Sequence, residues 1–294
     1  MSSVLVVGGA GGIGGEVIER LLARGRAVVA TVLNDEEASS VRARFGDRIP
    51  IEVVDLAEPE AARERLCVLA AAHPDLDGVI VCAGVAWFGP VETTPLAAFT
   101  RMMQINAVGT VAIYQATLPV LRQNAGRIVL ISTIAGRVPV SFMAAYSASK
   151  FAQEALCDNM RREAAPQGVK VSIITPAGGI KTKMVQKQVD GIQRELEALS
   201  AADQERYGYL FEGYSKFSSR SLASTAFPPE VVADVVFEAF DADQPKSRYL
   251  AGDGEIVTLL TAMTDDQRDR CFATLFAEGS TFTSKRIREF LAAE

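Results

Sequence analysis

Short runs rich in valine and isoleucine alternate with longer amphipathic segments over the first 180 or so of the 294 residues. The runs lack polar alternation, which is typical of strands buried on both faces of a parallel sheet. The segments between them carry apolar residues at helical spacing and charges on the other side. This alternation predicts right-handed βαβ units and an α/β fold with a doubly wound parallel sheet. The expected strands cover residues 4–7, 27–33, 49–54, 78–82, 128–131 and 169–175.

The first apolar run leads directly into the glycine-rich sequence GGAGGIGG at residues 8–15, and a helical pattern follows. Glycines allow a sharp turn, close approach of a pyrophosphate to the backbone, and tight packing of helix on strand. The N–H groups and dipole at the helix N-terminus favour the phosphates. The turn therefore predicts a Rossmann-type dinucleotide site. Two spacings fit, GxxxGxG and GxxGxxG, and the expected contacts are Gly8, Gly11, Gly12, Ile13 and Gly14.

The end of the second expected strand bears on the choice between NAD and NADP. An acidic residue there would bind the adenosine ribose of NAD, whereas a basic residue would accept the extra phosphate of NADP. The sequence at this point is TVLND, residues 31–35, without a charge at Val32 or Leu33. Leu33 and Asn34 are the expected cofactor contacts, and either Asn34 or Asp35 is within reach of the ribose. No Arg or Lys stands here or in the glycine turn, so NAD is slightly favoured over NADP.

Tyr146 and Lys150 form the clearest catalytic pair. They are four residues apart in a helical segment and so lie on one face. A lysine ammonium beside a phenol stabilises the phenolate and lowers the pKa of the tyrosine. The pair therefore predicts a general acid/base at Tyr146.

With these motifs the sequence resembles the short-chain dehydrogenase/reductase family, nearest its hydroxysteroid and retinol dehydrogenase branch, over nearly the whole chain. Residues 7–14 resemble the family's TGxxxGxG with Val7 where Thr is usual, Tyr146 and Lys150 match its YxxxK, and Asn106 matches its helix asparagine. The family's NNAG keeps only its second half here, and the loop after residue 175 is one residue longer than usual. The resemblance implies further cofactor contacts at Asp55, Leu56, Ala83, Gly84, Pro176, Gly178, Gly179, Ile180 and Thr182.

The main departure from the family pattern is at the catalytic serine. The usual interval back from Tyr146 ends on Thr133, with Ser132 one place earlier. Successive residues leaving a strand point to opposite sides, so only one of the two can face the substrate, and we predict Thr133. The resemblance implies that Thr133 positions the substrate oxygen and Tyr146 exchanges the proton. Lys150 would hold the cofactor ribose and lower the Tyr146 pKa, and Asn106 would anchor a water that links Lys150 to solvent.

The pattern changes after residue 182, although we expect one domain over residues 1–294. Residues 183–225 combine a helix-like stretch with a cluster of aromatic residues, which is interpreted either as a helical cap burying its own aromatics or as a mobile lid over an apolar substrate. Residues 226–294 are expected to hold C-terminal helices and a last strand at residues 248–251. The sequence thus predicts a helical substrate lid and a C-terminal extension.

Composition excludes several classes of function. The net charge of -6 disfavours nucleic acid as a partner, and a single histidine, His73, leaves no material for a histidine-based metal site or a Ser-His-Asp triad. We find no basic leader and no run of roughly 18–20 apolar residues. We therefore expect a cytoplasmic protein without a membrane span or a metal. The resemblance also implies a homodimer or homotetramer, paired through the helices that carry Asn106 and Tyr146.

The functional prediction is an NAD(P)-dependent oxidoreductase that transfers a hydride between nicotinamide and a secondary alcohol or ketone. The aromatic cluster and the family branch suggest a bulky apolar substrate. One alternative is a non-catalytic dinucleotide-binding redox sensor or scaffold, which the altered NNAG motif and Thr133 keep open. Another is an epimerase or dehydratase, which the GxxGxxG spacing permits, but Asn106 and the lack of a distinct sugar-nucleotide domain disfavour it.

Overall fold

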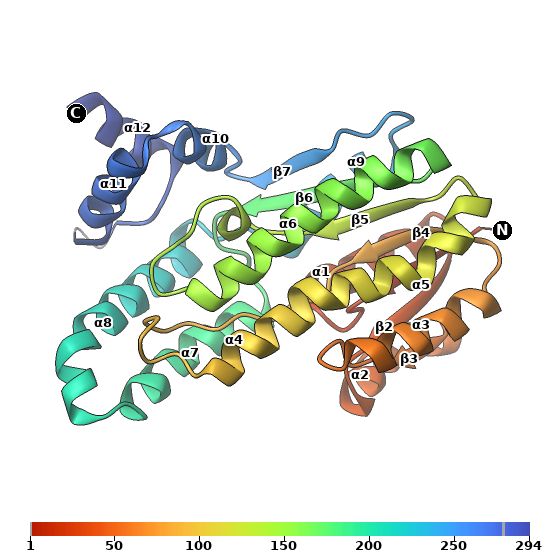
Figure 1. Cartoon of the computed structure of the whole chain (residues 1–294), viewed down its shortest axis with the longest axis horizontal. Helices are drawn as coiled ribbons and strands as arrows, with labels where there is room; N and C mark the ends of the chain where they lie inside the picture. The colour runs from red at the N-terminus through yellow and green to blue at the C-terminus, as the bar shows by residue number, and fades with distance from the viewer. Residues whose placement is uncertain (1, 278–279) are drawn as a thin grey trace.

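A parallel β-sheet forms the centre of the molecule in the computed structural model, which describes residues 2–277 and 280–294. Its seven strands have the order β3-β2-β1-β4-β5-β6-β7 (Figure 1). The order reverses between β1 and β4, the point outside which ligands bind in open α/β sheets. The predicted doubly wound α/β fold is confirmed. The strands are β1 Ser3–Val7, β2 Ala27–Val32, β3 Ile51–Val53, β4 Leu76–Val81, β5 Arg127–Ile131, β6 Lys170–Ala177 and β7 Arg248–Gly252.

Every expected strand is present, and the differences lie at strand ends. The expected strand at residues 49–54 is shortened to β3 because it lies at the sheet edge and pairs with β2 alone, from Ile51 to Val53. Conversely, β6 runs two residues beyond Thr175, because β7 pairs with it as far as Ala177 opposite Gly252. Strand ends therefore follow the neighbouring strand and not the apolar run itself.

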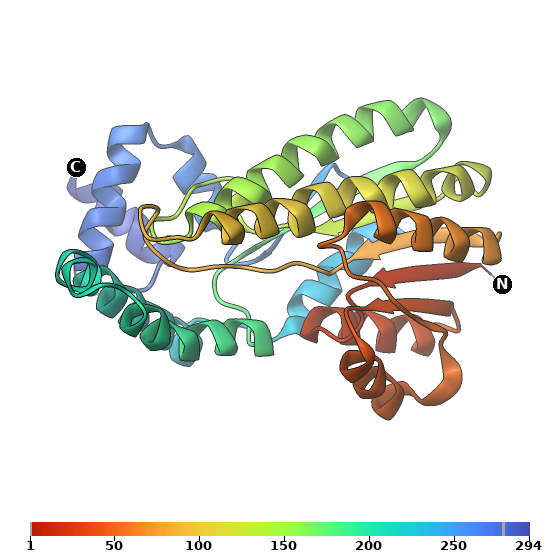
Figure 2. The same ribbon diagram turned by 60° about the horizontal axis from the view of Figure 1, so that its bottom comes forward.

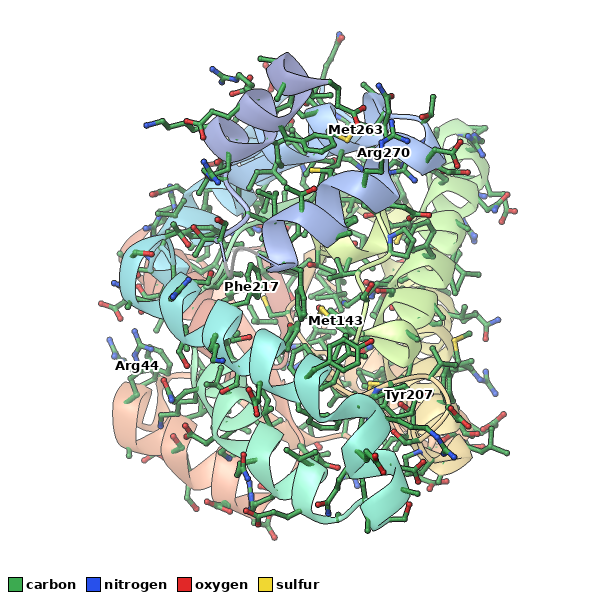
Figure 3. All side chains as sticks on the ribbon, turned by 90° about the vertical axis from the view of Figure 1, so that its left-hand side faces the viewer. Arg44, Met143, Tyr207, Phe217, Met263 and Arg270 are labelled. Carbon is green, nitrogen blue, oxygen red and sulfur yellow. The ribbon has the colours of Figure 1, made fainter. Side chains whose placement is uncertain are left out.

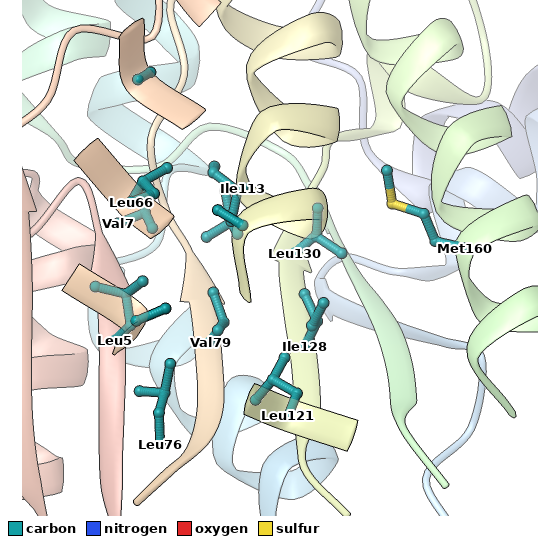
Figure 4. Packing of buried hydrophobic residues seen from close by; sticks show 14 of the residues in the cluster. Leu5, Val7, Leu66, Leu76, Val79, Ile113, Leu121, Ile128, Leu130 and Met160 are labelled. Carbon is teal, nitrogen blue, oxygen red and sulfur yellow. The ribbon is translucent and has the colours of Figure 1, made fainter. Parts of the chain in front are cut away.

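Helices cover both faces of the sheet, with α3, α5 and α6 on one side and α1, α2 and α9 on the other (Figure 2). Alternate strand residues point to opposite faces, so Val4 and Val6 join one core. Leu5 and Val7 join the other, which Figure 4 shows. Burying each such side chain contributes about 1.5–3 kcal/mol. The helices are α1 Gly12–Ala23, α2 Asp35–Phe45, α3 Pro59–Ala72, α5 Gly109–Gln123, α6 Ala144–Ala164 and α9 Pro229–Asp241.

One continuous helix, residues 96–123, is long and apolar enough to cross a membrane by length and composition alone. It joins α4 Leu96–Met102, a π-helical turn Met103–Val108, and α5. Its mean hydropathy reaches 1.2, and 44% of that stretch is buried inside the protein. Ile113 and Leu121 of α5 belong to the core on the sheet. A core helix passes the same test, so the absence of a membrane span stays a prediction.

Two groups of helices lie beyond the carboxyl ends of the strands. The hairpin of α7 Lys183–Glu197 and α8 Ala201–Ser224 corresponds to the predicted lid, and it lies beside the C-terminal helices (Figure 2). Its aromatic residues Phe211 and Tyr214 are buried against Phe142. The C-terminal extension has its own small core around Leu260. Its helices are α10 Glu255–Ala262, α11 Asp265–Ala277 and α12 Ser284–Ala293.

Candidate active site

A large cavity lies between the carboxyl ends of the strands, α8 and the C-terminal extension. Its empty volume, including the open mouth, is about 1490 Å³. Helix α8 contributes Tyr214 and Phe217, and the extension contributes Phe272 and Phe282. Figure 3 views this wall from outside, with Met143 and Phe217 beside α8. Many of the predicted site residues line the cavity, namely Ile13, Ala83, Gly84, Thr133, Tyr146, Lys150, Pro176, Gly178, Gly179 and Ile180.

The glycine turn joins β1 to α1 at the edge of this cavity. Gly8 has a φ of +87°, a conformation that favours glycine, and a Cβ there would lie 2.7 Å from the Ala83 nitrogen. A Cβ at Gly14 would lie 2.2 Å from the Gly8 oxygen. At Gly12 it would lie 3.2 Å from Thr182 Cγ2, whereas at Gly11 it would meet only an ordinary contact of 3.4 Å. The packing therefore favours the GxxxGxG spacing.

The same turn fits the pyrophosphate of a dinucleotide. Helix α1 begins at Gly12, and its first turn, residues 12–15, contains only glycine and isoleucine. No acidic side chain of this turn competes for its N–H groups and the positive end of its dipole, so both are available to a phosphate. Gly11 and Gly12 are exposed, so an anion can reach this backbone directly. The residues of the glycine turn therefore fit the pyrophosphate of the dinucleotide that the sequence predicts.

The predicted adenosine contacts lie at the ends of β2 and β3. Asn34 caps α2, its side chain accepting a hydrogen bond from the Glu37 nitrogen at 2.9 Å. Leu33 donates its N–H to the Glu37 carboxylate at 2.8 Å and is exposed. The Asp55 carboxylate accepts from the Ala57 nitrogen at 2.8 Å. Leu56 belongs to the buried core, so its side chain is not available to a ligand.

Tyr146 and Lys150 project from the first turns of α6 into the cavity. Burial raises the pKa of Tyr146 to about 12, and a hydrogen bond with Thr133 acts in the opposite direction. Burial lowers the pKa of Lys150 to about 8, while Cys157 and Glu154 act in the opposite direction. The structure thus differs from the expectation that Lys150 lowers the Tyr146 pKa. The reason is that burial dominates at Tyr146 and the Lys150 ammonium is bonded elsewhere.

Lys150 is held by a chain of buried hydrogen bonds that sequence reasoning missed. Its Nζ donates to the Ile131 carbonyl at 3.2 Å and to Gln153 Oε1 at 2.9 Å. Gln153 Nε2 donates to Thr110 Oγ1 at 2.8 Å, and Thr110 donates to the Asn106 carbonyl at 2.9 Å. The signal in the sequence was a glutamine three residues after Lys150, on a helix face that is otherwise buried.

Asn106 lies in the π-helical turn that precedes α5 and is 1% exposed. Its side chain accepts from the Val85 nitrogen at 3.0 Å and donates to the Val85 carbonyl at 2.8 Å and to Ser149 Oγ at 2.9 Å. Such turns are frequent at functional sites. Asn106 thus ties the loop after β4 to α6. Its backbone carbonyl is connected to Lys150 through the side chains of Thr110 and Gln153.

The two hydroxyls at the end of β5 have different surroundings. Thr133 bonds to the Tyr146 phenol and accepts from the Ala135 nitrogen at 3.4 Å. Ser132 Oγ is buried and has no hydrogen-bond partner among the described residues, although Ser132 contributes to the cavity wall. It lies next to Gly136, where a Cβ would be 3.0 Å away. The structure therefore places the Thr133 hydroxyl, and not that of Ser132, beside Tyr146. Thr133 is the residue predicted to face the substrate.

The chain resembles known dehydrogenases over most of its length. The family model described as short chain dehydrogenase matches residues 2–193. The 11-beta-hydroxysteroid dehydrogenase type 2 of Ovis aries is 34% identical over 86% of this chain and 61% of that protein. Retinol dehydrogenase 7 of Mus musculus is 30% identical over 85% of this chain and 80% of that protein. The chain thus spans less than two thirds of the length of the type 2 enzyme.

Solved structures show the same fold. A short-chain dehydrogenase from Streptomyces avermitilis has a TM-score of 0.70 at 22% identity, covering 94% of this chain and 95% of that chain. A short chain dehydrogenase from Burkholderia cenocepacia J2315 in complex with NADP has a TM-score of 0.70 at 24% identity, covering 92% of this chain and 96% of that chain. At these sequence identities, the two structures show that the fold is shared and nothing further.

Proposed function

Because the chain belongs to the short-chain dehydrogenase family, we propose that it is an NAD(P)-dependent oxidoreductase acting on secondary alcohols or ketones. The observation that carries this proposal is the grouping of Thr133, Tyr146 and Lys150 on one cavity wall. The glycine turn, whose shape fits a pyrophosphate, borders the same cavity. The relatives named above include a hydroxysteroid dehydrogenase and a retinol dehydrogenase, which supports the proposal.

Thr133, Tyr146 and Lys150 have different roles in the proposed reaction. A bound nicotinamide supplies or accepts the hydride at the substrate carbon. Thr133 donates a hydrogen bond to the substrate oxygen, and Tyr146 gives that oxygen a proton in reduction or takes it in oxidation. Lys150, held by Gln153, presents its ammonium to the same wall, where it would hold the cofactor ribose.

A bulky apolar substrate suits the cavity. Its outer walls are formed mainly by aliphatic and aromatic side chains of α8, the extension and the loop after β5, with Ser218 and Ser221 of α8 among them. Lys150 is the only charged residue among the described ones that line it. Away from Lys150, a charged group of a substrate would lose its hydration without gaining a charged partner, which disfavours it. The named relatives act on hydroxysteroids and retinol, which are substrates of this apolar kind.

We propose NAD as the preferred cofactor. The first turn of α2, next to the predicted ribose contacts, carries Asp35, Glu36 and Glu37. These carboxylates would repel the additional phosphate of NADP. The nearby Arg44 is bonded to Glu16 at 2.7 Å and to Glu19 at 2.5 Å, so its charge is already compensated.

The non-catalytic sensor is the less favoured alternative, because both Tyr146 and Lys150 are present and Thr133 is bonded to Tyr146. The test is to titrate the purified protein with NADH and NADPH, following nicotinamide and Trp87 fluorescence, and then to assay ketones, alcohols and UDP-sugars. We expect tighter binding of NADH and turnover of apolar ketones. Tight binding without turnover would favour the sensor, turnover of UDP-sugars the epimerase, and tighter NADPH binding would contradict the NAD proposal.

Alanine at Thr133 and at Ser132 should have unequal effects. We expect Thr133→Ala to lower kcat/KM by about 100-fold, because a hydrogen bond to the developing charge on the substrate oxygen is lost. Ser132→Ala should change it by no more than about 3-fold, because Ser132 Oγ has no hydrogen-bond partner among the described residues whose loss could be felt. Steady-state kinetics of the two variants with one ketone measures the contrast. The reverse order would assign the substrate contact to Ser132.

We also propose a homodimer or homotetramer formed through the helices that carry Asn106 and Tyr146. Met103, Val108 and Phe151 expose apolar side chains on these helices, and burying them against a second copy would be favourable. Sedimentation velocity would distinguish such an assembly from a 31.5 kDa monomer. The cytoplasmic location stays a prediction.

A further inference from the structure

Three residues of α8 with hydroxyl groups, Tyr214, Ser218 and Ser221, interrupt the apolar outer wall of the cavity, and the Ser221 hydroxyl is paired with that of Thr225. Tyr214 and Ser218 are four residues apart on α8 and therefore lie on one face of the helix. Both line the cavity, and their exposed fractions are only 7% and 8%. Their neighbours in this wall, Phe217 and Leu222, are apolar. Hydroxyls buried in such a wall need a hydrogen-bonding role, because burying an unpaired polar group is unfavourable.

The ring of Tyr214 is rigidly held. It stacks on Phe142 with a centroid distance of 4.9 Å and an interplanar angle of 25°. Phe88 packs against it at 5.0 Å. Aromatic pairs at these distances stabilise their arrangement beyond the burial of area. The position of the Tyr214 hydroxyl is therefore set before any ligand binds.

The hydroxyl of Tyr214 has only a weak acceptor. Its nearest partner is Met143 Sδ at 3.4 Å, and a thioether accepts hydrogen bonds poorly. The Ser218 hydroxyl lowers the pKa of Tyr214 by hydrogen bonding, the effect of a donor beside the phenol oxygen, while burial, the larger cause, raises it. An oxygen atom of a ligand would replace the sulfur with a gain in free energy.

This group lies close to the reacting centre. Met143 precedes Tyr146 by one helical turn, and both side chains line the cavity. The phenol of Tyr146 is near enough to that of Tyr214 to raise the Tyr214 pKa electrostatically. A ligand oxygen bonded to Tyr214 would belong to the same molecule as the oxygen at Tyr146.

We propose that Tyr214 and Ser218 form a second oxygen-recognition subsite, so that the substrate is an uncharged apolar molecule with a second oxygen near the reacting carbonyl or alcohol. The inference rests on the proposed function, because Tyr146 marks the reacting oxygen. Hydroxyketones and diketones are members of this chemical class. Tyr214 is thus a specificity-determining residue: it distinguishes substrates with the second oxygen from those without it.

The test compares 1-phenylpropane-1,2-dione with 1-phenylpropan-1-one, which has the same carbon skeleton and one oxygen less. Each substrate is assayed with the wild type, Tyr214→Phe, Ser218→Ala and Tyr207→Phe. The last is a matched control, since Tyr207 is on the same helix but its hydroxyl bonds to Glu92 outside the cavity. Comparing variant with wild type for each substrate separately cancels the difference in intrinsic reactivity.

We expect Tyr214→Phe to lower kcat/KM for the dione by about 10-fold, the effect of one lost hydrogen bond, and to change that for the monoketone by less than about 2-fold. Ser218→Ala should show the same selectivity to a smaller degree, and Tyr207→Phe should affect neither substrate. An equal loss for both substrates, or no loss for either, would overturn the subsite.

A second readout separates this inference from the proposed function. Calorimetric titration of the cofactor-loaded protein measures the affinity for the dione and the monoketone without turnover. Weaker dione binding by Tyr214→Phe, with unchanged monoketone binding, supports the subsite even if the wild type reduces neither compound. Absence of turnover by the wild type would contradict the proposed function, whereas equal affinities of wild type and Tyr214→Phe for the dione would overturn the subsite alone.

Discussion

Replacing Tyr146 with phenylalanine is expected to lower kcat/KM for ketone reduction by about 10²- to 10⁴-fold, the range attributed to a positioned general acid or base. The change removes the only atom that exchanges a proton with the substrate oxygen and preserves the aromatic ring. The raised pKa of Tyr146, about 12, means that the group carries its proton at neutral pH and is ready to donate it. Steady-state kinetics in the direction of reduction measures the loss.

The binding of cofactor provides the control for this variant. The dissociation constant for NADH should change by less than about 10-fold, because the glycine turn is unaltered and a lost neutral hydrogen bond contributes about 0.5–1.5 kcal/mol. Tyr114→Phe on α5 is the matched substitution outside the cavity and should retain wild-type activity. Near-normal turnover by Tyr146→Phe would rule out Tyr146 as the proton donor, and a large loss of cofactor affinity would indicate a disturbed fold.

Replacing Arg248 with methionine is expected to destabilise the fold by about 3 kcal/mol, the lower end of the range for breaking a buried ion pair. Arg248 of β7 pairs with Glu154 of α6, and their side chains are 21% and 6% exposed. Without the guanidinium, the Glu154 carboxylate is left buried and uncompensated. Thermal denaturation should show a melting temperature about 6–12 °C lower, at 2–4 °C for each kcal/mol in a protein of this size.

A double variant tests the cause of that loss. Combining Arg248→Met with Glu154→Leu removes both charges and should restore most of the stability, since apolar replacement of a buried pair is often neutral. Lys216→Met, which breaks an exposed pair with Glu212, should cost less than about 1 kcal/mol. An unchanged melting temperature in Arg248→Met, or no recovery in the double variant, would contradict the assigned role of the pair.

Much of the fold could be read from local patterns. The valine- and isoleucine-rich runs identified the first six strands, because a strand buried on both faces must be apolar throughout, and β7 was expected from the separate short run at residues 248–251. The glycines after β1 identified the sharp turn into α1, because Gly8 and Gly14 have no room for a side chain. The four-residue spacing placed Tyr146 and Lys150 on one helical face. Each of these features depends on residues that are near one another in the chain.

The environment of the site depended on the tertiary structure. The Lys150 ammonium meets Gln153 and, through it, Thr110 of a different helix, a contact that no spacing in the chain encodes. Burial, which raises the pKa of Tyr146, is a sum over elements far apart in sequence.

The sequence by itself thus determined the order of strands and helices and the identity of the reacting side chains, because backbone periodicity and spacing are local. Only the tertiary structure decided where β3 and β6 end, that Thr133 and not Ser132 bonds to Tyr146, and that α8 supplies Tyr214 to the cavity. The physical reason is that strand pairing, desolvation and hydrogen bonds between distant elements exist only when the layers have packed together.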